Sequence, residues 1–248
     1  MVQFDPTLQL PTSDELLDSD DLPVDNELHT LVPNFLRFIL SFIWSSRLDW
    51  FFGVNMGVYH TTGINLKIPI VPDGFLSLGI DRLLPKRKGK LRSSYVVWEE
   101  KNIVPIFALE VVSQTPGDEY DEKMEIYAKL GVLYYLIYNP EYWLRDQHEP
   151  FEMYRLVDGI YQRLISEPFW MPEVGLGIGR AWGIHDRVER EWLYWYDEHR
   201  RRYLSPEEQT QQAQQQALEA QQQALEAQNR SQQLEEILRS LGVDPNTI

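Results

Sequence analysis

Hydrophobic positions show no regular period at the start of the chain and a helical period soon after it. Residues 1–24 are rich in Pro, Asp and Ser, a composition typical of a loosely ordered acidic leader. Between residues 28 and 43 apolar side chains recur at helical spacing, so we predict a helix that packs one face on a core. This helix begins near Asp25, or near Leu31 if Pro33 lies in its first turn.

From residue 50 onward the pattern changes to short β-like segments separated by turns. The predicted strands cover residues 50–59, 68–71, 75–78, 95–98, 106–113 and 132–138. The segment 106–113 is almost wholly apolar around Glu110, which is typical of a strand buried on both faces. A helix is predicted to follow, opened by Pro116-Gly117-Asp118 and running to Leu130, because Gly131 suits a helix C-terminus.

The later part of the chain is predicted to form further β structure. Segments 151–157 and 160–165 flank Asp158-Gly159, a dipeptide that favours a tight hairpin turn. Two more β segments are expected at 176–182 and 191–196. The glycines in residues 175–179 lack both the spacing of a phosphate-binding loop and a following helix, so we interpret them as part of a strand or turn.

The composition changes sharply near Ser205, where the chain becomes rich in Gln, Ala and Glu. These residues favour a long helix over 205–248. The heptapeptide QQQALEA occurs twice in succession, at 214–220 and 221–227, and a seven-residue period can form a coiled coil. The tail is therefore expected either to join copies into a homodimer or higher homo-oligomer, or to form a solvated or internally docked helix. The predicted organisation is a leader (1–24), a central domain (25–204) and a helical tail (205–248).

Composition excludes several classes of protein. Hydrophobic residues make up 43% and charged residues 25%, so the chain is neither mainly disordered nor collagen-like. The absence of cysteine excludes disulfides, thiolate zinc sites, iron–sulfur ligation and a cysteine nucleophile. The five histidines lie far apart along the chain, which excludes a local HExxH zinc helix.

The formal net charge of −15 argues against a protein that coats nucleic acid. The charge is unevenly spread, because residues 1–36 contain eight acids and no Lys or Arg, whereas residues 82–92 contain six bases and no acid. No secretory leader is visible, and the most apolar run, 31–44, is too short and too interrupted to span a bilayer. We therefore expect a soluble cytoplasmic protein without a membrane partner.

Three residues of the central segment are candidates for chemistry: Asp73, Glu110 and Lys123. A carboxylate within an apolar strand costs several kcal/mol unless a partner compensates it. Two carboxylates without a nearby cysteine or histidine form a hard-oxygen ligand set that suits Mg²⁺. The alternative is that Lys123 simply pairs with Glu110 as a structural partner.

Pro72-Asp73, followed by Glu110 in LEVVS, resembles the PD-(D/E)xK nuclease superfamily. More narrowly, LEVVSQT together with DEKMEIYAKLGVLYYLIYNP resembles the Uma-type family of restriction-endonuclease-like proteins, from about Asp25 to Tyr203. The resemblance implies an α/β fold with a restriction-endonuclease-like core, in which helices flank a central mixed sheet, with extra β-hairpins and the long C-terminal helix added. It also implies a metal-dependent endonuclease that acts on DNA with Mg²⁺, for which Mn²⁺ can substitute.

On this resemblance, Asp73 and Glu110 hold the metal ion and a backbone carbonyl near Val111 is a third ligand. The lysine that the superfamily pattern places two residues after the acid is Val112 here. The resemblance implies that Lys123, from the following helix, supplies the ammonium group instead. Because of this departure, a catalytically inactive nuclease-fold protein that acts as a binding or assembly module through its tail is the alternative. A hydrolase for a smaller phosphate ester is a third.

Supporting roles are predicted for a few further residues. Glu27 matches a position where the superfamily often supplies an additional acid, and its alternative role is a favourable charge at the helix N-terminus. Gln114 follows the strand of Glu110 and can touch substrate. Tyr127 lies four residues after Lys123, so it shares that helix face and either orients Lys123 or packs beside it.

Two other segments bear on the site. Glu99-Glu100-Lys101 is a literal ExK and provides a fallback for the acid and the lysine, although its polar surroundings favour a loop or an edge. The basic stretch 85–92 is expected either to line the rim of the site and contact DNA phosphates or to be an ordinary solvated loop. The candidate DNA contacts in it are Lys86, Arg87, Lys88 and Lys90.

Overall fold

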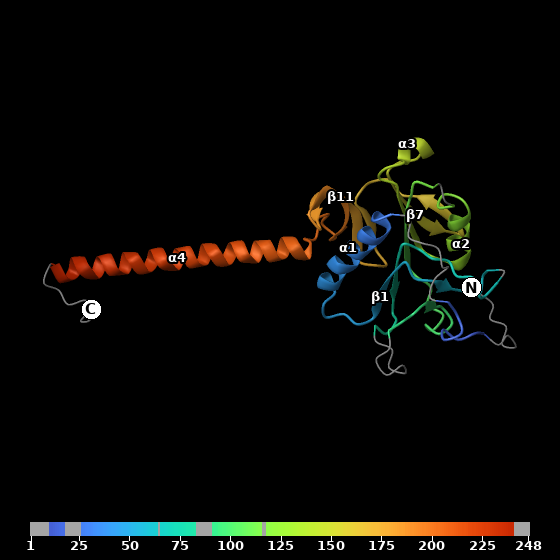
Figure 1. Cartoon of the computed structure of the whole chain (residues 1–248), viewed down its shortest axis with the longest axis horizontal. Coiled ribbons are helices and arrows are strands. Elements are labelled where there is room, and N and C mark those ends of the chain that lie inside the picture. The colour runs from blue at the N-terminus through green and yellow to red at the C-terminus, as the bar shows by residue number, and fades with distance from the viewer. Residues whose placement is uncertain (1–9, 18–25, 64, 83–90, 116–117, 241–248) are drawn as a thin grey trace. The chain divides into compact units, whose positions relative to one another are not determined.

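The computed structural model describes residues 10–17, 26–63, 65–82, 91–115 and 118–240 (Figure 1). The chain divides into two compact units, Met1–Tyr203 and Leu204–Ile248. The first unit is mixed α/β, and the second contains the long C-terminal helix. The predicted α/β fold class, with a central mixed sheet flanked by helices, is confirmed.

The first unit contains three helices and eleven strands within the described residues. The helices are α1 (Leu28–Ile43), α2 (Glu122–Leu130) and α3 (Trp143–Asp146). The strands are β1 (Trp50–Val54), β2 (Val58–Tyr59), β3 (Gly74–Leu78), β4 (Tyr95–Val96), β5 (Phe107–Val111), β6 (Tyr134–Tyr138), β7 (Phe151–Val157), β8 (Ile160–Arg163), β9 (Phe169–Met171), β10 (Leu176–His185) and β11 (Val188–Tyr196).

The central sheet has six strands among the described residues, in the order β1-β3-β5-β6-β7-β8. Strands β5 and β6 pair in parallel, and all other neighbours in this sheet are antiparallel. Smaller sheets form from β9, β10 and β11 and from β2 and β4. Strand β5 is thus an interior strand, and all five of its residues are buried. This confirms the strand predicted around Glu110.

Alternation along β5 divides its side chains between two cores. Phe107, Leu109 and Val111 face the cluster that includes α1 and the β9–β11 sheet. Ala108, on the other face, packs in the cluster that contains Tyr127 of α2. Because successive strand residues point to opposite faces, Glu110 belongs to the α2 face together with Ala108. The two helices therefore cover opposite faces of the sheet.

Helix α2 forms the crossover between the two parallel strands, as such pairs require. It begins at Glu122, a few residues later than the Pro116-Gly117-Asp118 turn suggested, and positions 116 and 117 lie outside the described residues. It ends at Leu130 and is capped by Gly131, whose φ of 92° is left-handed and whose N–H donates to the carbonyl of Tyr127 at 3.0 Å. The predicted C-terminal glycine is confirmed.

Hairpin turns were only partly visible in the sequence. The β7–β8 hairpin turns through Asp158 and Gly159, both with positive φ, as predicted. The β10–β11 hairpin turns through Asp186 and Arg187, also with positive φ. This turn contains no glycine, so the sequence did not indicate where it lies, and both strands are longer than predicted. Residues 175–179 form a turn and the start of β10, as interpreted.

Other segments differ from the prediction in detail. The 50–59 region splits into β1 and β2, and the predicted strand at 68–71 reduces to a single bridge between Ile70 and Val58. Within the leader, Leu16 packs against Tyr59 and Val96. The extent of these strands depends on backbone pairing with neighbouring segments rather than on local composition.

Helix α4 (Pro206–Ser240) forms the second unit, and positions 241–248 lie outside the described residues. Ser205 and Glu208 cap it reciprocally: the Ser205 N–H donates to Glu208 Oε2 at 2.7 Å, and the Glu208 N–H donates to Ser205 Oγ at 3.1 Å. None of its 35 residues is buried. Among the described residues, no helix is both long enough and apolar enough to cross a bilayer.

Candidate active site at the end of strand β5

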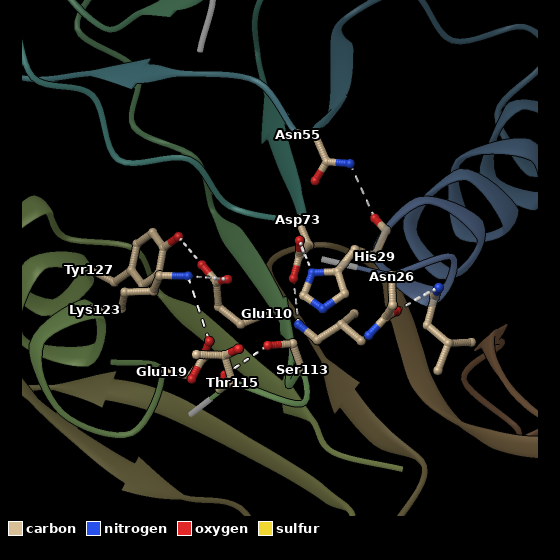
Figure 2. Close-up of polar contacts among 12 residues, drawn as sticks. Asn26, His29, Asn55, Asp73, Glu110, Ser113, Thr115, Glu119, Lys123 and Tyr127 are labelled. Carbon is tan, nitrogen blue, oxygen red and sulfur yellow. Dashed lines mark hydrogen bonds and ion pairs between the residues drawn. The ribbon is translucent and has the colours of Figure 1, made fainter. Parts of the chain in front are cut away.

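Glu110 is a buried carboxylate held by two side chains of α2. It is 1% exposed, near the C-terminal end of β5. Lys123 Nζ donates to Glu110 Oε2 at 2.9 Å, and Tyr127 Oη donates to Glu110 Oε1 at 2.5 Å (Figure 2). Lys123 and Tyr127 are four residues apart, so they share one face of the helix. One helix face thus supplies donors to both oxygens of Glu110.

Asp73 joins this cluster from the start of β3. The antiparallel register pairs Gly74 with Leu109, so Asp73 lies beside the last residues of β5. Its Oδ2 accepts the N–H of Val111 at 2.7 Å, and the residue is 8% exposed. The two acids are 37 positions apart in sequence, and the strand register places them at the same end of the neighbouring strands β3 and β5.

His29 is a site residue that the sequence reasoning missed. Its Nδ1 lies 2.8 Å from Asp73 Oδ1, and the side chain extends from the first turn of α1 (Figure 2). Asn55 lies beside this pair, and its Nδ2 donates to the His29 carbonyl at 3.3 Å. A signal existed, because His29 is a polar residue on the core-facing side of a predicted helix. The residues near His29 in sequence do not indicate which acid it contacts.

A second buried acid lies on the other side of the lysine. Glu119 precedes α2, is 6% exposed and places Oε1 at 3.9 Å from Lys123 Nζ. Lys123 therefore lies between two carboxylates, while its own side chain is 30% exposed. The Lys123 side chain is therefore more exposed than those of Glu110, Glu119 and Asp73.

The electrostatics of the site follow from burial and proximity. Burial raises the pKa of Glu110 to about 7; the Lys123 ammonium opposes this rise and the Asp73 carboxylate adds to it. Burial lowers the pKa of Lys123, but the Glu110 carboxylate outweighs that effect, and the net pKa is above its ordinary value. Burial, followed by the charge on Glu110, raises the pKa of Tyr127 well above its ordinary value. Lys123 therefore remains a cation and Tyr127 a neutral donor.

Residues 22–185 match a protein-family model, Uma2, whose description is "Putative restriction endonuclease". The chain belongs to the Uma2 family. No curated protein and no solved structure matches it. The family description indicates a nuclease, and therefore a hydrolase with DNA as its substrate. The resemblance inferred from the LEVVSQT and DEKMEIYAKLGVLYYLIYNP segments is confirmed at the level of the family.

The supporting residues expected in this Uma2 member lie in different places. Tyr127 contacts Glu110, as described. Glu27 is exposed at the N-terminus of α1, where its carbonyl accepts the N–H of Leu31 at 2.9 Å. Gln114 is also exposed, and its carbonyl accepts a hydrogen bond from Arg145 Nη1 at 2.5 Å. The candidate DNA contacts Lys86, Arg87, Lys88 and Lys90 lie outside the described residues.

The literal ExK segment has partners of its own. Glu99 accepts hydrogen bonds from Ser13 N and Ser13 Oγ at 3.0 and 2.6 Å. Lys101 lies in a turn with φ of 58° and pairs with Asp81 at 3.3 Å. The acid and the lysine of this segment therefore contact different parts of the chain. Glu110 and Lys123, by contrast, contact each other.

The donor set of the site fits a hard divalent cation. Among the described residues, no group of three or more His, Cys, Asp and Glu side chains is placed to hold a metal ion. Asp73 and Glu110 provide two carboxylates instead. Mg²⁺ commonly binds through one or two carboxylates and keeps waters and substrate oxygens as its other ligands. A structural zinc site, by contrast, requires four protein ligands.

Proposed function

We propose that this protein is a Mg²⁺-dependent endodeoxyribonuclease that hydrolyses phosphodiester bonds at the Asp73–Glu110–Lys123 cluster. One observation carries the proposal. The Asp73 and Glu110 carboxylates lie at the same end of the neighbouring strands β3 and β5, and an ammonium group from helix α2 lies 2.9 Å from Glu110. Membership in the Uma2 family supports the same reaction class.

Asp73 and Glu110 would hold the metal ion, with Mn²⁺ as a substitute for Mg²⁺. When bound, the ion would polarise a phosphoryl oxygen and lower the pKa of a coordinated water. Each acid already accepts a hydrogen bond from a donor within the core, and this limits its rotation: Val111 N–H for Asp73 and Tyr127 Oη for Glu110. Such preorganisation reduces the cost of assembling the site when substrate arrives.

Lys123 would act as a cation rather than as a base. Its pKa is raised by Glu110, so at neutral pH it carries a proton that it can donate in a hydrogen bond. Its side chain is partly exposed, so a phosphate at the surface of the cluster could approach it. There it would orient the attacking water or offset the negative charge that develops on the phosphate.

A nuclease assay tests this assignment. We expect the purified protein to cleave DNA in Mg²⁺ or Mn²⁺ and to be inactive in EDTA. Asp73→Asn and Glu110→Gln should abolish cleavage, and Lys123→Met should reduce it by about 10²–10³-fold, the usual effect of removing one transition-state donor. The matched controls are Glu99→Gln and Lys129→Met, since Lys129 is an exposed lysine on the same helix. Both should cleave like the parent protein.

Cleavage that persists in EDTA, or in the Asp73 and Glu110 variants, would reject the assignment.

Metal binding distinguishes the nuclease from the alternative function, a binding or assembly module. An inactive nuclease fold that acts through its helical tail should show no Mg²⁺ or Mn²⁺ binding that depends on Asp73. No residue of α4 is buried, and this supports the second function, because a helix that acts through another chain needs an accessible surface.

A further inference from the structure

We infer that His29 is a positioning residue that holds the Asp73 carboxylate in the orientation required to bind a divalent cation. This inference rests on the proposed function and adds to it a residue that acts through Asp73. The sequence gives no motif for it, because His29 precedes Asp73 by 44 positions and comes from a different element.

The contacts of Asp73 show how its orientation is determined. Oδ1 lies 2.8 Å from His29 Nδ1, and Oδ2 accepts the Val111 N–H at 2.7 Å. The form of Asp73 that binds a cation is the carboxylate, which only accepts hydrogen bonds, so in that form His29 donates through the Nδ1–H tautomer. One donor from α1 and one from β5 therefore hold the two oxygens separately. Because a carboxylate offers about four lone-pair sites, these two bonds leave acceptor capacity on both oxygens for a cation.

The position of His29 is itself fixed by close packing. It is 8% exposed, and Val32 and Pro33 on the same helix are buried. Helix α1 approaches the start of β3 so closely that a Cβ added at Gly74 would lie 3.0 Å from Pro33 Cβ and 3.2 Å from the Phe52 ring. The absence of a side chain at Gly74 therefore allows α1 to bring the imidazole to Asp73.

Asn55 fixes the backbones of both residues. Its N–H donates to the Asp73 carbonyl at 3.1 Å, and its Nδ2 donates to the His29 carbonyl at 3.3 Å (Figure 2). Its φ of 45° is left-handed, a conformation that Asn tolerates better than most residues. The imidazole and the carboxylate are thus connected by a direct hydrogen bond and through a shared third residue.

Hydrogen-bond partners of metal ligands orient those ligands, and their loss typically reduces metal affinity or activity by about 10–100-fold. A residue that only fills space in the core would have no such effect on metal affinity. The distinguishing measurement is therefore the Mn²⁺ dissociation constant, obtained by calorimetry on the full chain.

We expect His29→Ala to weaken Mn²⁺ binding by about 10–100-fold. His29→Asn should restore much of the affinity, because its amide nitrogen can replace Nδ1 as the donor. The matched control is His60→Ala, which removes another buried imidazole whose Nδ1 contacts Thr62 Oγ1 instead of a site residue. It should bind Mn²⁺ like the parent. In the cleavage assay, excess metal should return the kcat of His29→Ala toward the parent value.

Parent-like Mn²⁺ affinity in His29→Ala would overturn this inference while leaving the proposed function intact. A parent protein that neither binds Mn²⁺ nor cleaves DNA would overturn both.

A second measurement uses the parent protein only, so it does not depend on whether His29→Ala folds. In protein with ¹⁵N-labelled histidine, saturating Mg²⁺ should shift the ring resonances of His29 and leave those of His60 in place. Unshifted His29 resonances would also overturn the inference.

Discussion

At the scale of one residue, burial of the Glu110 carboxylate reduces stability, although the proposed function requires this acid. A fully buried carboxylate loses its hydration, and this raises its pKa despite the neighbouring ammonium. Two fixed donors, Lys123 and Tyr127, reduce the cost without removing it. The protein thus keeps an acid where an apolar residue would be more stable. Such a cost is expected where a side chain is retained for binding or catalysis.

The raised pKa of Glu110 predicts a pH-dependent stability in the presence of EDTA. Between pH 4.5, its ordinary pKa, and about 7, the folded protein holds a proton on Glu110 that the unfolded chain has released. The stability contributed by Glu110 is therefore fully present below the lower value and is lost as the pH rises through the higher one. The loss amounts to about 3 kcal/mol for a shift of this size.

Glu110→Gln cannot ionise, so its stability should lack this component. We expect its free energy of unfolding, relative to that of the parent, to increase by about 3 kcal/mol from pH 4 to pH 8. Urea denaturation at a series of pH values measures the difference. Glu99→Gln serves as the control for loss of an acid elsewhere. Parallel curves for Glu110→Gln and the parent would contradict the raised pKa.

At the scale of elements, helix α2 and helix α4 differ in what stabilises them. Helix α2 is short, ends at a left-handed glycine and packs Tyr127 and Leu130 into a core. Helix α4 has 35 residues, a reciprocal cap at its start and no buried residue. Helices in proteins are generally stabilised by the burial of an apolar face. Because the repeated leucines of α4 are not buried within the chain, we predict that they contact a second chain.

Self-association through α4 would depend on Leu218 and Leu225, which occupy equivalent places in the two QQQALEA repeats and are both more than half exposed. We expect the full chain to have the mass of a dimer or higher oligomer in light scattering. Replacing both leucines by Gln should shift the protein toward monomer. Glu219→Gln with Glu226→Gln, one position later in each repeat, is the control and should leave the mass unchanged. A monomeric parent would contradict association.

At the scale of the whole molecule, charge must be reconciled with a DNA substrate. A net charge of −15 repels DNA at long range. Approach of DNA therefore requires a local positive region. The basic stretch 85–92 lies in sequence between Asp73 and Glu110 and is the densest run of cations without an acid. It remains a prediction that this stretch lines the site.

Salt dependence of DNA binding tests the role of this stretch. Each phosphate neutralised by a cation adds about 0.9 to the slope of log affinity against log salt concentration. If all four cations contact phosphate, replacing Lys86, Arg87, Lys88 and Lys90 by Ala should reduce that slope by about 3 to 4. Filter binding with metal-free buffer measures it. An unchanged slope would show that the stretch is an ordinary solvated loop.

The sequence by itself determined those features that depend on neighbouring residues. Apolar periodicity predicted α1, the run around Glu110 predicted β5, and Asp158-Gly159 predicted a hairpin. These predictions succeeded because helix period, strand burial and turn chemistry act over a few residues. The order of motifs around Asp73 and Glu110 was also sufficient to indicate the family.

Tertiary structure alone decided which side chains meet. The hydrogen bond of His29 to Asp73 depends on the packing of α1 over Gly74, and the donors to Glu110 depend on the crossover by α2. The β10–β11 turn lacks a local signal and follows from strand pairing. Contacts between distant segments arise from the burial of shared apolar surface, which no short stretch of sequence specifies. The site is therefore assembled by the packing of elements that local patterns only outline.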